Sequence, residues 1–395
     1  MLNPRLAELS DYPFDRLRAL LDGLPPGGEP ILLSVGEPRH PPPPMLGEVL
    51  ARHADEWDRY PPVEGTADFR RAVVEWLNRR YRLPAPLLDP ERHVLPVAGT
   101  REGLFLIATA CVPETKNGRR PAVLMPNPFY QVYLGAAVLR GAEPVLLPAT
   151  RAGGFLPDLA ALTPDLLART AVLYLCSPAN PQGSVADAAM LSAAIALARR
   201  HDFTLIVDEC YAEIYDREPP TGALAVCAAT DGGLANVVVF HSLSKRSSVP
   251  GLRSGFCAGD PAIITAFRRL RAYGGATLPL PVLAASAALW RDEEHVDANR
   301  ALYRHKFDAA ERRLDGRFGF YRPAGGFFLW LDVGDGEAAG RRLWQEAGLR
   351  VLPGAYLARG NGADNPGQPY IRVALTPDLP TTDEALRRLA NVLEL

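Results

Sequence analysis

"VVVFHSLSKRSSVPGLRSG", residues 237–255, joins a buried strand to a polar and basic turn. Apolar residues lead directly into His-Ser-Leu-Ser-Lys, and Arg253 follows eight positions after Lys245. Lysine usually lies where water can reach it, but this one follows a hydrophobic run. A lysine at the mouth of an apolar pocket loses its charge readily and can form a Schiff base with an aldehyde. The stretch therefore predicts a ligand site at the end of a core strand. A surface loop is the alternative for Lys245 taken alone.

The same kind of strand recurs along the chain. From about residue 45 to 285, helical periods such as "TADFRRAVVEWLNRRY" separate short apolar runs: "PAVLMP", "AVLYLCSP", "FTLIVDEC", "NVVVFHS" and "SGFCAG". This alternation predicts βαβ units and a mostly parallel sheet. We therefore expect an α/β protein with a large domain over 45–285. A long charged helix and short strands predict a smaller α+β domain over 286–395, with the N-terminal segment 1–44 packing against it.

Polar residues follow three of the apolar runs. Asn180 comes after "VLYLCSP", Asp208 after "FTLIV", and Ser242 and Lys245 after "NVVVF". Ligands bind at the carboxyl ends of strands in open α/β sheets, so these residues predict one shared pocket. A buried Asp208 would be costly without a cationic partner, and a protonated ring nitrogen would be one. A helix cap or a structural ion pair is the alternative for Asp208, and a simple turn is the alternative for Asn180.

A second segment offers donors for a phosphate group. "VAGTREGLFLIATA" (97–110) opens an apolar helix after Gly-Thr-Arg, and free amides and the helix dipole there favour an anion. Ser242, Ser244 and Arg253 add hydroxyls and a guanidinium fork. An ordinary capped helix is the alternative. Neither a G-x-G-x-x-G motif after a strand nor a Walker motif is present, so dinucleotide and nucleoside-triphosphate sites lack their motifs.

The composition of the chain excludes several classes of binding partner. The net charge of -2 over 395 residues gives no basic excess for a nucleic-acid backbone. Five scattered cysteines without a C-x-x-C pair predict a reduced protein, and we expect no metal site. The first 23 residues are polar and amphipathic, and no stretch reaches the roughly 18 apolar residues of a membrane span. We therefore expect a cytoplasmic protein that binds neither nucleic acid nor membrane.

These groups supply an aldehyde trap, a phosphate cup, a counter-ion for a ring nitrogen and an aromatic face at Tyr130, which is equally explained as a core aromatic. Pyridoxal 5'-phosphate (PLP) needs that set. The chain resembles class I/II PLP-dependent aminotransferases of fold type I over essentially its whole length, through "AGTREG", "NPFYQVY", "SPANPQG", "DECYAEIY", "SLSKRSSVPGLRSG" and "IRVAL" in order. The resemblance implies a large domain with a mostly parallel seven-stranded sheet flanked by helices, a smaller α+β domain, and a homodimer with active sites at the subunit interface.

The resemblance also implies cofactor roles. Lys245 forms the Schiff base, Asp208 faces the pyridine nitrogen, and Tyr130 stacks on the ring. Tyr211 and Asn180 face the phenolic oxygen. The phosphate is expected to contact Gly99, Thr100, Arg101 (through the backbone), Ser242, Ser244, Arg253 and Tyr60, the last from the neighbouring subunit.

On the substrate side, Arg372 in "IRVAL" is expected to grip the α-carboxylate, next to Asn180, and Gly36 lies in the loop that closes over it. A narrower resemblance, in stretches such as "LSVGEPRHPPP" and "PNPFYQVYLGAA", is to proteobacterial N-succinyldiaminopimelate aminotransferases of lysine biosynthesis. It implies ping-pong transfer between glutamate/2-oxoglutarate and N-succinyl-2-amino-6-ketopimelate. Both substrates carry a distal carboxylate, for which Arg39 is the candidate partner; a solvated arginine is the alternative.

Other functions stay open at this stage. An aspartate, alanine or aromatic aminotransferase or a C–S lyase would share the same motifs. "RAYGGATLPLPV" departs from the narrower resemblance near the expected substrate pocket and leaves specificity open. A PLP-binding regulator is disfavoured, because the aminotransferase pattern begins almost at residue 1 and the charge is not basic. Intact Lys245, Asp208 and Arg372 disfavour a catalytically inactive homologue.

Overall fold

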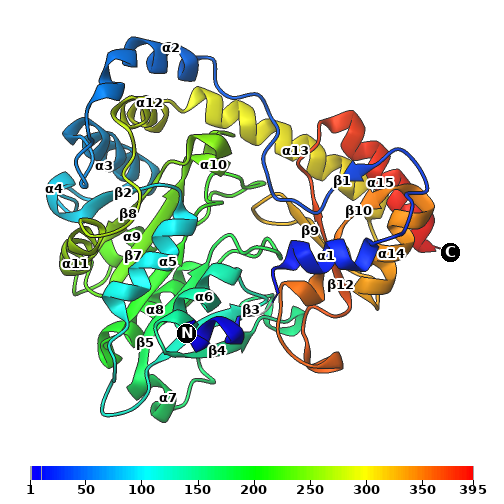
Figure 1. Cartoon of the computed structure of the whole chain (residues 1–395), viewed down its shortest axis with the longest axis horizontal. Coiled ribbons are helices and arrows are strands. Elements are labelled where there is room, and N and C mark those ends of the chain that lie inside the picture. Colours follow the sequence, from blue (N-terminus) through cyan, green and yellow to red (C-terminus); the bar gives the residue numbers. More distant parts are fainter. Residues whose placement is uncertain (1, 10, 395) are drawn as a thin grey trace.

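A computed structural model describes residues 2–9 and 11–394 of the chain. Its centre is a seven-stranded sheet in the order β2-β8-β7-β6-β5-β3-β4 (Figure 1). β8 is antiparallel to both β2 and β7, and the other neighbouring pairs in this sheet are parallel, so the predicted mostly parallel sheet is confirmed. The strands are β2 (Val94–Val97), β3 (Ala122–Asn127), β4 (Glu143–Pro148), β5 (Thr170–Cys176), β6 (Thr204–Asp208), β7 (Val237–Ser242) and β8 (Gly255–Gly259).

Both faces of this sheet are covered by helices, because the central strands are apolar on both sides. In β7, Val237 and Val239 belong to one hydrophobic cluster, while Val238 and Phe240 belong to another. On one face lie α3 (Ala67–Tyr81), α8 (Ala188–His201), α9 (Ala223–Ala228) and α12 (Leu280–Arg291); on the other lie α5 (Thr100–Cys111), α6 (Gln131–Leu139) and α11 (Pro261–Arg271). Continuous apolar strands of this kind are typical of a parallel sheet buried on both faces.

Shorter elements complete this part of the chain. They are α2 (Met45–Arg52), α4 (Pro90–His93), α7 (Pro164–Arg169), α10 (Leu243–Arg246), and the 3₁₀ turns Ala54–Asp58, Arg151–Gly153 and Pro250–Leu252. The helix predicted from "TADFRRAVVEWLNRRY" is α3, with Thr66 accepting a hydrogen bond from the amide of Phe69 as its N-cap.

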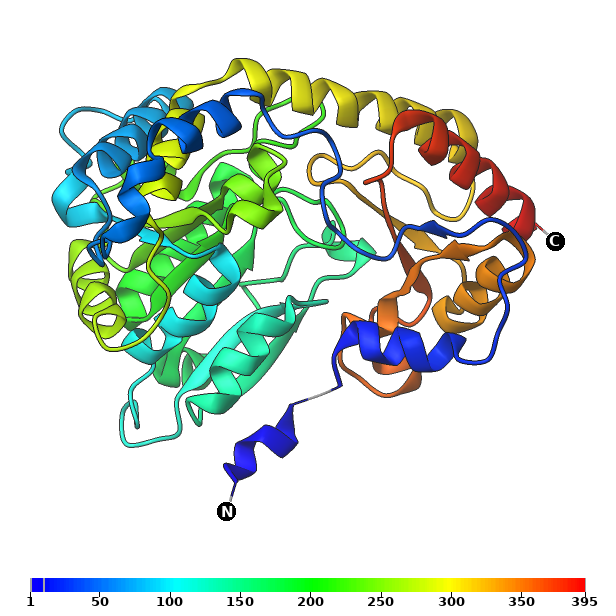
Figure 2. The same cartoon turned by 45° about the horizontal axis from the view of Figure 1, so that its top comes forward.

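The C-terminal unit has its own sheet and core. The antiparallel sheet β11-β12-β9 is formed by β9 (Phe328–Asp332), β11 (Leu352–Pro353) and β12 (Tyr370–Ala374), packed with α14 (Gly336–Ala347) and α15 (Leu379–Glu394). Helix α13 (Glu294–Leu314) runs from the large sheet to this unit in both views (Figures 1 and 2). The remaining 3₁₀ turns are Gly354–Tyr356 and Gly362–Asp364.

Residues 13–32 of the N-terminal segment lie on the C-terminal unit, whereas its first turn contacts α6 of the large domain. The N-terminal segment forms the 3₁₀ turn Pro4–Glu8, α1 (Pro13–Leu21) and β1 (Ile31–Leu32), and β1 pairs in parallel with β10 (Leu349–Arg350). The indole of Trp344 donates a hydrogen bond to the carbonyl of Leu24, which adds a second attachment. Across the part of the chain that the structure describes, every helix is too short or too polar to cross a membrane.

Candidate active site

The carboxyl ends of β5, β6 and β7 meet at one edge of the large sheet, since these three strands are parallel neighbours. A cavity opens there between the large sheet, the N-terminal segment and the C-terminal unit. Residues from all three parts line it: Tyr12, Pro13, Phe14, Val35, Gly36, Thr100, Arg101, Phe129, Tyr130, Gln131, Tyr133, Cys176, Asn180, Asp208, Cys210, Tyr211, Lys245, Phe328, Leu357 and Arg372. Segments far apart in the sequence thus form one site, as the strand-end pattern predicted.

Lys245 enters this cavity from the short helix α10, whose N-cap is Ser242. Its Nζ donates a 2.6 Å hydrogen bond to the carbonyl of Gly36. The pKa of Lys245 is lowered to about 8, chiefly by burial and also by the nearby Arg372 and Arg253, against the opposing influence of Cys210 and Glu37. About a tenth of this amine is therefore uncharged at pH 7, far more than for an ordinary lysine. Gly36 packs closely, because a Cβ there would lie 2.5 Å from the ring of Phe328.

Asp208 ends β6 as a buried carboxylate. Its Oδ2 accepts a hydrogen bond of 2.6 Å from the hydroxyl of Tyr133, and its Oδ1 accepts one of 3.2 Å from the amide of Cys210. Burial raises the pKa of Asp208, although these hydrogen bonds act in the opposite direction. Among residues 2–9 and 11–394, no basic side chain forms an ion pair with it, so a cationic ring nitrogen would supply the missing partner.

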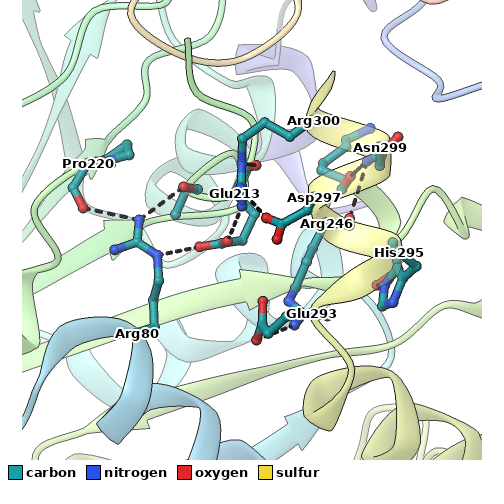
Figure 3. Close-up of polar contacts among 12 residues, drawn as sticks. Arg80, Glu213, Pro220, Arg246, Glu293, His295, Asp297, Asn299 and Arg300 are labelled. Carbon is teal, nitrogen blue, oxygen red and sulfur yellow. Dashed lines mark hydrogen bonds and ion pairs between the residues drawn. The ribbon is translucent and has the colours of Figure 1, made fainter. Parts of the chain in front are cut away.

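The other acids of "DECYAEIY" have partners within the protein. Glu209 accepts hydrogen bonds from the hydroxyl of Tyr81 at 2.9 Å and from the amide of Ala223 at 2.7 Å. Figure 3 shows the Glu213 carboxylate between Arg80 and Arg300, which donate to it at 2.6 and 2.9 Å. Only Asp208 of these three acids lines the cavity.

A second cavity beside the first brings the predicted phosphate ligands together. Its lining includes Thr100, Ser242, Ser244, Lys245 and Arg253. Gly99 has φ +80°, and a Cβ there would lie 2.0 Å from a guanidinium nitrogen of Arg253, so the glycine permits this close approach. The start of α5, two serine residues and an arginine thus surround one space, which suits a phosphate dianion.

Arg372, on β12, forms the opposite side of the first cavity. It donates to Oδ1 of Asn180 at 3.0 Å and to the carbonyl of Ser34 at 2.7 Å, and it lies over the ring of Phe328. Burial lowers its pKa to about 10, so it remains a cation at neutral pH. Its buried Nε has no hydrogen-bond partner among the described residues, which leaves a donor for a carboxylate.

Tyr211 and Tyr130 also line the first cavity. Tyr211 is buried, and that burial raises the pKa of its hydroxyl well above the ordinary value. Tyr130 accepts a 2.9 Å hydrogen bond from Nε of Arg101. The expected ring-stacking role of Tyr130 stays a prediction.

Three predicted residues lie outside both linings: Gly99, which contacts Arg253 of the second cavity, and Arg39 and Tyr60. Arg39 is exposed and lines neither cavity, and Tyr60 is fully exposed in the single chain. Tyr60 is expected to act in the site of a neighbouring subunit, which explains its absence from these linings. No such expectation explains the position of Arg39.

Sequence reasoning missed two contributors. Tyr133 holds Asp208, and its position three residues after Tyr130 in "NPFYQVY" could have shown it, since that spacing keeps both on one side of a helix start. The side chain of Arg101 also lines both cavities, although only its backbone was expected to matter.

The residues present fit PLP: Lys245 is an amine of lowered pKa, Asp208 is a buried acid without a cationic partner, and Thr100, Ser242, Ser244 and Arg253 surround a space for a phosphate. Together with the fold they define a PLP-dependent enzyme of the aminotransferase kind.

Comparison with known proteins gives the family. The sequence profile of "Aminotransferase class I and II" matches residues 29–390, and the chain belongs to that family, whose cofactor is PLP. It is 31% identical over 398 residues to the LL-diaminopimelate aminotransferase of Desulforudis audaxviator (strain MP104C), covering 98% of this chain and 97% of that protein.

Solved structures of aminotransferases are also similar to this chain. An aminotransferase from Neisseria meningitidis Z2491 is 38% identical, with a TM-score of 0.93 and 99% of each chain covered. A probable N-succinyldiaminopimelate aminotransferase from Thermus thermophilus is 27% identical, with a TM-score of 0.83 and coverage of 96% of this chain and 98% of that one.

Proposed function

We propose that this aminotransferase exchanges an amino group between glutamate/2-oxoglutarate and N-succinyl-2-amino-6-ketopimelate, in diaminopimelate and lysine biosynthesis. One observation carries the reaction: Lys245, Asp208 and Arg372 line a single cavity. The names of two of the similar proteins, both diaminopimelate-type aminotransferases, support the substrate class.

Each side chain then has a task. When bound, PLP supplies an electron sink for the pair released as the substrate α-carbon loses its proton. Lys245 would take that proton at Nζ and deliver it to C4' of the cofactor, because its lowered pKa keeps part of the amine uncharged near neutral pH. Asp208 holds a positive charge on the ring nitrogen, and Arg372 fixes the substrate α-carboxylate.

Arg101 is the proposed partner of the distal carboxylate, in place of Arg39. It lies at the wall of both cavities, and its guanidinium contacts only the hydroxyls of Tyr130 and Tyr12, at 2.9 and 3.5 Å. No acidic residue in the described part of the chain pairs with it, so its charge is available to an anion.

The distal end of the substrate separates two candidates. LL-diaminopimelate, in the name of one relative, carries a distal ammonium beside its distal carboxylate. The succinylated compound replaces that ammonium with an amide and adds a carboxylate. Asp208 is the only acid among the described residues that line the first cavity, and it lies on the cofactor side. Glu37 lines the second cavity beside Arg101, so the choice between the two compounds rests on Arg101, which lines both cavities and favours the more anionic succinylated substrate.

The test compares both compounds as amino donors to 2-oxoglutarate with purified holoenzyme. We expect kcat/KM to be at least tenfold higher for N-succinyl-LL-diaminopimelate. Arg101→Gln should reduce that kcat/KM at least tenfold, while the matched variant Arg39→Gln stays within twofold of wild type. A preference for LL-diaminopimelate would contradict the succinyl assignment, and activity with aromatic or neutral donors alone would contradict the dicarboxylate class.

The enzyme is also proposed to act as a homodimer with Tyr60 completing the site of its neighbour. The side chain of Tyr60 has no shielding in the single chain, its relative exposure being 102%. Sedimentation equilibrium should give twice the chain mass, and Tyr60→Phe should weaken PLP binding. A monomeric, fully active enzyme would contradict this arrangement.

A further inference from the structure

Lysine is scarce in this chain, and its three positions are unusual. Of 43 basic residues other than histidine, only Lys116, Lys245 and Lys306 are lysines. Lys306, on α13, is 1% exposed; its Nζ donates to the carbonyl of Leu375 at 3.1 Å and lies 2.6 Å from Nε2 of His40. Lysine, unlike arginine, can give up its proton in such a setting.

A hydrogen-bonded chain leads from Lys306 to the backbone of Lys245. Nδ1 of His40 lies 2.7 Å from Oδ1 of Asn299, and Nδ2 of Asn299 donates to the carbonyls of Lys245 and Arg246 at 3.3 and 3.2 Å. Figure 3 shows Asn299 on its helix close to Arg246. This series of hydrogen bonds connects the C-terminal unit, the N-terminal segment and residues 243–248, which carry Lys245 and are called the Lys245 turn below.

The direction of each bond in this chain is fixed. The amide nitrogen of Asn299 is used by two carbonyls, so its oxygen accepts and Nδ1 of His40 donates. Nε2 of a neutral His40 must then accept from Lys306. A protonated His40 would instead present a second cation to Lys306 and break the chain.

The chain also closes a loop around the reactive amine. The carbonyl of Gly36 accepts from Nζ of Lys245 at 2.6 Å, and the carbonyl of His40 accepts from Oγ of Ser248 at 2.9 Å. Residues 36–40 therefore contact the Lys245 turn at both of their ends, through Gly36 and His40. Leu375, at the other end of the chain, follows Arg372 by three positions.

We propose that Lys306, His40 and Asn299 are positioning residues that hold the Lys245 turn in register with the Arg372 strand and keep residues 36–40 against it. The inference rests on the proposed role of Lys245. Burial and the nearby charge of Lys306 lower the pKa of His40, against the opposing hydrogen bond to Asn299. Burial also lowers the pKa of Lys306 to about 8, against the opposing charge of Asp378. Neutral His40 with charged Lys306 is thus the pair expected near pH 7.

Lys306→Met and Lys116→Met form a matched test. Lys116 also donates to backbone carbonyls, those of Thr170, His201 and Asp202, but outside the active-site lining. In Lys306→Met holoenzyme, we expect the pKa of the visible cofactor absorbance to shift by about 0.5 or more and kcat to fall about tenfold, with KM for glutamate within twofold. Lys116→Met should lower the melting temperature alone.

His40 variants keep the test decisive if Lys306→Met folds poorly. His40→Asn retains a donor toward Asn299 but offers nothing to Lys306, whereas His40→Ala removes both contacts. The absorbance pKa and kcat of His40→Asn should lie between those of wild type and His40→Ala. Lys306→Met behaving like Lys116→Met, or His40→Ala matching wild type in both readouts, would overturn the proposal. Failure of the proposed function would look different, because Lys245→Ala would then keep the cofactor absorbance.

Discussion

Asp208 and Glu213 are buried carboxylates five residues apart, yet their surroundings differ completely. Glu213 lies between two arginines, and Arg300 is held further by Asp297 at 2.6 Å (Figure 3). Asp208 has a tyrosine hydroxyl and one backbone amide. A buried charge paired with cations within the protein serves the fold, whereas one left without a cation costs stability until a ligand supplies it. The difference separates the residue that binds the cofactor from the residue that supports the structure.

The largest effect should come from the unpaired acid. Asp208→Asn removes the negative charge opposite the ring nitrogen, and we expect kcat/KM to fall about 1000-fold or more, on the order of 4 kcal/mol. The free energy of unfolding of the cofactor-free protein should not fall, because no ion pair is lost. Steady-state kinetics and urea unfolding measure the two quantities. A variant that is unstable but catalytically normal would reverse the assignment.

Glu213→Ala should show the opposite pattern. Two buried arginines lose their partner, so we expect the free energy of unfolding to fall by about 3–4 kcal/mol. Activity per folded molecule should stay within about fivefold of wild type at a temperature where the variant is folded. If activity falls far more than stability does, Glu213 contributes to the site directly.

Tyr133→Phe should lower kcat/KM less than Asp208→Asn does. It removes the 2.6 Å hydrogen bond to Asp208 while keeping the ring that stacks on Tyr174. We expect kcat/KM to fall about tenfold, the size of one hydrogen bond to a charged group. An unchanged kcat/KM would mean that Tyr133 only fills space.

The smallest effect concerns pH. The pKa of Asp208 is raised above its unfolded value of 3.8, so the folded chain keeps this proton longer as pH rises. Cofactor-free wild type should therefore lose stability relative to Asp208→Asn as pH rises above about 4, by about 1.4 kcal/mol for each unit by which the pKa is raised. The difference should level off above the raised pKa. Thermal unfolding of both proteins from pH 4 to 8 measures it, and a difference that shrinks with pH would contradict the buried, unpaired state.

Local patterns in the sequence predicted the sheet and much of the site. Alternating apolar runs and helical periods gave the strands, and polar residues at the ends of β5, β6 and β7 gave the cavity. Strand ends can be predicted because parallel neighbours bring them to one edge. The contrast between Asp208 and Glu213 could not be predicted, since it depends on Arg80 and Arg300, which are distant in sequence.

The proposed partner of the distal carboxylate also could not be predicted from local sequence. Arg39 and Arg101 are both exposed, but Arg101, at the start of α5, lines the cavities and Arg39 does not. Proximity in sequence to the glycine loop favoured Arg39, whereas the position of Arg101 depends on contacts distant in sequence, such as its hydrogen bond to the hydroxyl of Tyr12.

Chemical trapping identifies which lysine binds the PLP aldehyde. The holoenzyme is reduced with borohydride and digested, and the peptide carrying the pyridoxyl group is sequenced. With only three lysines in the chain, the outcome is unambiguous. We predict the label on Lys245 in wild type and its loss in Lys245→Ala. A label on Lys116 or Lys306, or none at all in an enzyme that transaminates, would contradict the account.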